Sequence, residues 1–166
     1  MAYVDTQSVV AADLNNMLRG LNRDNATYTV TGTTAETNMA PLSITGGTIG
    51  ETGGLLVVAA GTITNTGSGQ KDIRLYLGAT TIATVTRTAA NAQDWLIVAW
   101  CFNTSASAQR WVVQYSTSDA ATLTGDYTTS AIDTASTQTL KVTGDLADAT
   151  DTITQTAFDV FLVQIT

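Results

Sequence analysis

The stretch QKDIRLYLGATTIATVT, residues Gln70–Thr86, decides the fold of this chain. Its first half alternates apolar and polar side chains, which places Ile73, Leu75 and Leu77 on one face. A period of two is typical of a half-buried β-strand, and Gly78 begins a tight turn before a second strand. The stretch therefore predicts a β-hairpin whose core face is formed by Ile73, Leu75 and Leu77.

The composition favours an all-β domain. The 166 residues are 44% hydrophobic and 13% charged, with 13 glycines and a single proline. Threonine is frequent, and its β-branched side chain favours strands. The apolar content is too high and too periodic for a disordered chain, and the length is sufficient for one domain with its own core.

Further strands are predicted on both sides of the hairpin, with no helix between them. They are Ala40–Thr45, Leu55–Thr64, Asp94–Asn103, Gln109–Ser116, Tyr127–Ile132, Gln138–Thr143 and Thr152–Ile165. This spacing predicts an antiparallel jelly roll or β-sandwich of about eight strands. Asp94–Asn103 and Thr152–Ile165 are apolar at consecutive positions, which indicates strands that are covered on both faces.

The N-terminal part has a different pattern. Apolar residues at helical spacing over Ser8–Leu21 predict a short amphipathic helix, with a stripe formed by Val10, Leu14, Met17, Leu18 and Leu21. A helix this short needs a docking surface, which is either its own domain or another copy or partner. Asn22–Glu36 is polar and predicts an arm with a possible short strand at Thr27–Thr31. We therefore divide the chain into a helix and arm (1–35) and a β-sandwich domain (36–166).

Charge and residue types argue against several functions. A net charge of −7 disfavours binding to nucleic acid or to anionic lipid. No apolar run is long enough to span a membrane, and the N-terminus lacks the pattern of a signal peptide, so we expect synthesis in a cytoplasm. The chain has no histidine, which removes Ser-His-Asp triads and most zinc sites. The single Cys101 lies in an apolar run and has no basic partner, so we expect neither an enzyme nor a cofactor.

Three motifs have both a functional and a structural interpretation. The glycine-rich GGTIGETGG at Gly46–Gly54 precedes a strand rather than a helix, which favours a connecting loop over a phosphate site. The three aspartates of Gly144–Asp151, which are Asp145, Asp148 and Asp151, favour a solvated turn over a calcium site. The tryptophans Trp95, Trp100 and Trp111 favour core packing over a sugar-stacking platform.

Several pieces of the chain together resemble a known domain type. They are the entry at Thr34–Thr37, the strand at Gly54–Gly61, the hairpin at Lys71–Thr80, the aromatic strand at Asp94–Trp100 and the late strand at Thr139–Gly144. This pattern, over about Thr33 to Thr166, resembles the jelly-roll domains of tailed-phage virion structural proteins. The resemblance implies a virion protein that assembles as a homotrimer, as in fibres, spikes and capsid decorations, with no catalytic residues.

The resemblance and the short chain together suggest a capsid decoration (cement) protein that binds the major capsid protein on the virion surface. The alternative is a head- or tail-fibre domain that recognises a host glycan. We expect the oligomer or capsid contacts at the N-terminal stripe and the last strand, that is, at Val10, Leu14, Met17, Leu18, Leu21, Phe158, Phe161, Val163 and Ile165.

Overall fold

Eleven strands make up the part of the chain that the structure, a computed structural model, describes: residues 18–64, 66–67, 69–88, 91–118 and 124–164. In chain order they are β1 (Leu18–Asp24), β2 (Tyr28–Val30), β3 (Thr37–Ile44), β4 (Gly54–Thr64), β5 (Lys71–Leu77), β6 (Thr80–Arg87), β7 (Gln93–Ser105), β8 (Ala108–Thr117), β9 (Thr124–Ser130), β10 (Gln138–Leu146) and β11 (Thr152–Val163).

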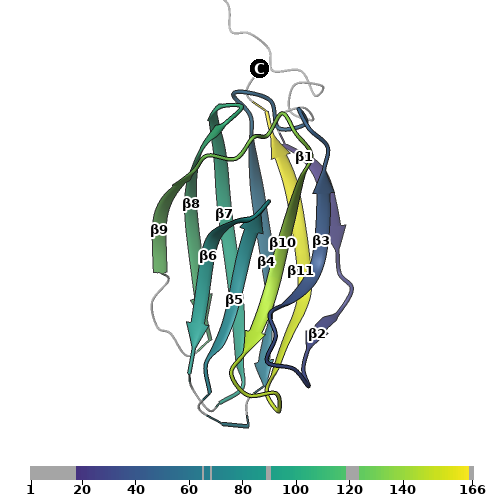
Figure 1. The fold of residues 1–166 in the computed structure, drawn as a ribbon, viewed down its shortest axis with the longest axis vertical. Coiled ribbons are helices and arrows are strands. Elements are labelled where there is room, and N and C mark those ends of the chain that lie inside the picture. Colours follow the sequence, from purple (N-terminus) through teal and green to yellow (C-terminus); the bar gives the residue numbers. More distant parts are fainter. Residues whose placement is uncertain (1–17, 65, 68, 89–90, 119–123, 165–166) are drawn as a thin grey trace, which may run out of the picture.

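The strands form two antiparallel sheets that pack face to face (Figure 1). The large sheet has the order β1-β11-β4-β7-β8-β9, and β2 pairs with β11 as well. The small sheet has the order β3-β10-β5-β6. The prediction of an all-β antiparallel sandwich is therefore confirmed, although the described residues form more strands than the eight or so expected. No helix among these residues is long and apolar enough to cross a membrane.

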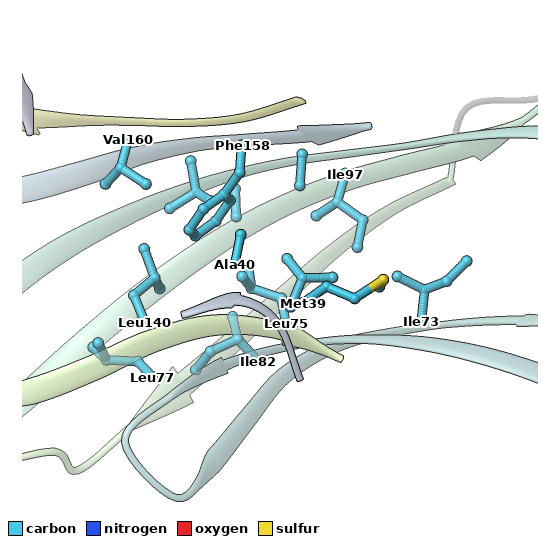
Figure 2. Close-up of a cluster of buried hydrophobic side chains, with 14 of the residues drawn as sticks. Met39, Ala40, Ile73, Leu75, Leu77, Ile82, Ile97, Leu140, Phe158 and Val160 are labelled. Atoms are coloured by element: carbon cyan, nitrogen blue, oxygen red, sulfur yellow. The ribbon is translucent and has the colours of Figure 1, made fainter. Parts of the chain in front are cut away.

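The core lies between the two sheets. Figure 2 shows Ile97, Phe158 and Val160 of the large sheet directed toward side chains of the small sheet. Among these, Leu75 and Leu77 belong to the hairpin of β5 and β6, and both are fully buried, as is Ile73. Strand alternation thus places one face of each strand in a shared apolar layer, as in other aligned sandwiches.

The N-terminal segment corrects one prediction. Leu18 and Leu21, assigned above to the end of a helix, lie in strand β1, which pairs with β11 from Leu18 opposite Val163 to Asp24 opposite Phe158. The predicted helix residues before Leu18 lie outside the described residues. The apolar spacing of this segment is helical. A strand forms nevertheless, because the backbone N–H and C=O groups on the side of β11 that faces away from β4 need hydrogen-bond partners, which β1 supplies. The short strand expected near Thr27–Thr31 is present as β2, which also pairs with β11.

A buried ion pair joins the start of β5 to the turn before β11. The Nζ atom of Lys71 lies 2.9 Å from Oδ2 of Asp151, and both side chains are fully buried. The other carboxylate oxygen, Oδ1, accepts hydrogen bonds from the backbone N–H and the hydroxyl of Thr66. Lys71 also donates to the carbonyl of Gly67. The charge of each partner is thus compensated by the other and by nearby polar groups.

We predict that the substitution Asp151→Asn lowers the free energy of unfolding by about 3–5 kcal/mol, because it leaves a buried lysine without its counter-charge. Urea unfolding monitored by circular dichroism measures this loss. The matched control is Asp148→Asn, an exposed acid of the same turn, which should change stability by less than about 0.5 kcal/mol. Equal midpoints for the two variants would contradict the role of the pair.

The same carboxyl makes the wild-type stability depend on pH. Burial by itself raises the pKa of Asp151, but the hydrogen bonds from Thr66 and Lys71 outweigh it, so the pKa lies below its ordinary value. A carboxyl of this kind stabilises the native state above its unfolded pKa of about 3.9. That contribution is lost as the pH falls through the folded pKa. Unfolding midpoints should therefore fall below about pH 4 more steeply in the wild type than in Asp151→Asn.

Candidate interaction surface

The outer face of the large sheet, which points away from the core, is apolar. Outward-facing side chains from five neighbouring strands form what we call the apolar patch: Leu56, Val58, Val98, Trp100, Phe102, Val112, Tyr127, Phe161 and Val163. One row of cross-strand neighbours runs from β11 to β9 through Phe161, Leu56, Trp100, Val112 and Tyr127. Figure 1 views the sandwich from the side of the small sheet, so the patch lies on its far side.

The patch contains four of the five large apolar side chains that are exposed among the described residues. Trp100 is 37% exposed, Phe102 is 38%, Val112 is 42% and Tyr127 is 59%. The rings of Trp100 and Phe102 are stacked, with centroids 6.4 Å apart and an angle of 5° between their planes. None of the nine side chains is charged. Covering the patch would therefore be favourable, by about 25 cal/mol for each Å² of apolar surface removed from water.

The outer face of the small sheet has the opposite character. Arg74 forms ion pairs there with Asp72, with Asp145 at 2.9 Å and with Glu36 at 3.3 Å. The hydroxyl of Thr86 donates to the Asp72 carboxylate at 2.7 Å. This network of charges is suited to contact with water. The outer face of the small sheet is therefore polar, whereas the outer face of the large sheet carries the apolar patch.

A shallow, open hollow of about 540 Å³ continues the patch along β4, β7 and β8. Ala60, Leu96, Ser116 and Thr156 contribute to its lining. Because Ala60, Ser116 and Thr156 are small, a neighbouring surface can approach the sheet more closely here than over the aromatic rows. The large sheet thus offers a raised aromatic region next to a depression.

The predicted contact residues have different positions in the structure. Leu18, Phe161 and Val163 lie on the outer face, and Leu18 is 47% exposed. Leu21 is partly buried and packs against the core. Phe158 is fully buried between the sheets, so its prediction as a contact residue is wrong: the alternation along β11 directs it inward. The remaining predicted residues, Val10, Leu14, Met17 and Ile165, lie outside the described residues.

Sequence reasoning missed the main part of the patch. Trp100 was expected in the core together with Trp95 and Trp111, but only the last two are buried. The signal was present in Asp94–Asn103, which is apolar at consecutive positions. That pattern indicated cover on both faces, whereas the described residues cover only the inner face of this strand.

The other motifs have structural roles. The three turn aspartates contact different groups: Asp145 pairs with Arg74, Asp151 pairs with Lys71, and Asp148 accepts hydrogen bonds from Thr150. Among the described residues, no group of three potential ligand side chains is placed to hold a metal ion. The loop Gly46–Gly54 connects β3 to β4, and its Gly50 carbonyl accepts a hydrogen bond from Asn103.

Cys101 lies on the inner face of β7 and is fully buried. Burial raises the pKa of its thiol to about 12 and outweighs a backbone hydrogen bond with Leu55 that lowers it. Because the thiolate is the reactive form of cysteine, this thiol is inert in the folded protein.

Comparisons with known proteins identify only distant likenesses. No protein-family model and no curated protein matches the chain. The lectin UEA-II complexed with galactose is 12% identical, over 89% of this chain and 92% of that chain, with a TM-score of 0.44. The lectin II from Ulex europaeus has the same identity and coverage and a TM-score of 0.41. The VP2 subviral particle of infectious bursal disease virus is 13% identical over 99% of this chain and 46% of that chain, with a TM-score of 0.30.

We predict that Cys101 does not react with a thiol reagent such as 5,5′-dithiobis(2-nitrobenzoate) at pH 8 in the native state, and that it reacts fully in denaturant. The reason is the combination of burial and a pKa near 12. Absorbance of the released thiolate measures the modification. Rapid labelling of the folded protein would contradict the position of this residue inside the core.

Proposed function

We propose that this chain is a bacteriophage virion structural protein, a capsid decoration protein that binds the major capsid protein on the outer shell as a homotrimer and stabilises it. Its place is the virion surface, after synthesis in the host cytoplasm. The observation that carries the proposal is the uncharged, aromatic patch on the outer face of the large sheet, in a chain whose net charge is −7. The sequence resemblance to phage virion domains supports the same assignment.

The mechanism is assembly rather than chemistry. Covering apolar surface stabilises a contact in proportion to its area. Many identical copies on a regular shell then raise the overall stability well above that of a single contact, because neighbouring contacts act together. A folded β-sandwich with its own core supplies a rigid surface, so little order has to be gained on binding.

Binding to particles tests this function. We expect the purified protein to co-sediment with shells made without it, to saturate at many copies spread over the surface, and to raise the temperature at which the shells break. Absence of binding, or attachment of a few copies at one vertex or at the tail, would reject the decoration role.

A variant without residues 1–17 tests the predicted N-terminal contact. This deletion keeps all of β1, which begins at Leu18, so circular dichroism should show an intact fold. We expect reduced binding to shells. Unchanged trimer and shell binding would remove the N-terminal segment from the contact.

A glycan-binding domain of a head or tail fibre is the second candidate. The stacked and exposed rings of Trp100 and Phe102 favour it, because flat aromatic surfaces stack on sugar rings. In this case a glycan array would give specific binding that Trp100→Ala abolishes. A decoration protein without a receptor role binds no glycan on the same array.

A further inference from the structure

Two opposite charges border the apolar patch on opposite sides. Arg110 of β8 is exposed and lies next to Phe102. Asp159 of β11 lies next to Val58 on the outer face. Strands β4 and β7 separate β8 from β11 (Figure 1). Three strand spacings amount to about 14 Å, so these two charges cannot meet within one copy of the chain.

One oxygen of the Asp159 carboxylate lacks a donor among the described residues. This atom, Oδ1, is buried and accepts no hydrogen bond from them. The cross-strand neighbour on β1 is Arg23, whose side chain is exposed and forms none of the ion pairs of the described chain. A buried carboxylate oxygen without a donor is costly, and a cation beside the half-buried side chain would compensate the charge of this group.

The charge of the whole chain limits what can cover the patch. Copies that each carry a net charge of −7 repel one another, unless they meet through a surface without acidic groups. The apolar patch is such a surface, and its two borders carry charges of opposite sign. A basic partner protein would instead be attracted to the acidic groups elsewhere on the chain.

We propose that copies of this chain associate through the apolar patch, with Arg110 of one copy against Asp159 of the next. Trp100, Phe102 and Phe161 then lie in the centre of the subunit contact, and the arginine faces the half-buried side chain of Asp159. The number of copies, three, rests on the proposed function. The contact itself rests on the patch and its bordering charges.

Sedimentation equilibrium of the full chain tests the contact. We expect three times the chain mass for the wild type. A dissociation constant raised by at least about 100-fold is expected for Trp100→Glu, because this substitution puts a charge into the centre of the contact. The matched control, Thr84→Glu, adds the same charge to the exposed outer face of the small sheet and should keep the wild-type mass. Circular dichroism verifies that both variants fold.

Exchanging the charges of Arg110 and Asp159 tests whether these two residues face each other between copies. Arg110→Glu and Asp159→Lys should each weaken association by about tenfold, and the double variant should return to within about threefold of the wild type. The two sites are too far apart within one copy to interact directly. Recovery in the double variant therefore reports contact between copies.

Several outcomes would overturn this contact. A wild-type chain that stays monomeric, equal masses for Trp100→Glu and Thr84→Glu, or no recovery in the double variant would each reject it. If deletion of residues 1–17 from a monomeric protein increased acrylamide quenching of Trp100 fluorescence, the chain's own N-terminal segment would be the cover instead. Trp95 and Trp111 are buried, so Trp100 dominates that signal.

The mass measurements and the shell-binding experiment test the subunit contact and the decoration role separately. If the chain binds shells but does not associate in the mass measurements, the proposed function is retained and this contact is rejected. A chain that forms the contact but binds no shells keeps the contact and loses the decoration role. A twofold mass that depends on Trp100 would keep the contact and reject the trimer.

Discussion

The antiparallel pairing of β11 with β4 is the constraint on which both faces of the large sheet depend. Because side chains alternate along a strand, a shift of one residue would expose Phe158 and bury Phe161. A glycine holds the register: a Cβ atom on Gly61 would lie only 1.8 Å from the carbonyl oxygen of Thr154, beside the irregularity that follows Gln155. Since only glycine permits this close approach of the two backbones, the observed register, and with it the direction of the side chains of β11, requires glycine at this position.

The strands and the core hairpin follow from local patterns, and these the sequence predicts well. Ile73, Leu75 and Leu77 are two residues apart, and a period of two is a property of a single strand. The segment around Leu18 differs, because its apolar spacing also fits a helix. Gly20 and Asn22 are weak helix formers, and Leu18–Asp24 pairs with a strand more than 130 residues further along the chain. A long-range partner of this kind leaves no local signal.

The apolar patch and the buried ion pair show two further limits of sequence reasoning. The pattern around Trp100 reveals that both faces of β7 are apolar, but the same pattern results whether the second face is covered by the chain itself or by another molecule. Lys71 and Asp151 are 80 residues apart, and each lies in a polar neighbourhood where an exposed charge is the usual outcome. Only the packing of the small sheet, which contains β5, against the large sheet, which contains β11, brings these two charges together away from water.

The difference between the two outer faces determines how strong an assembly of this protein can be. On the small sheet, Arg74 lies among three carboxylates and Lys141 lies over the ring of Tyr76, so this charged face gains little from being covered. Attraction must come from the large sheet, but Trp100 and Phe102 are already more than half covered in the single chain. Each contact through the patch therefore adds only part of the burial free energy of its aromatic side chains. A surface with this balance gives modest association for a single contact, and repetition of the contact on a regular array would make the overall association strong.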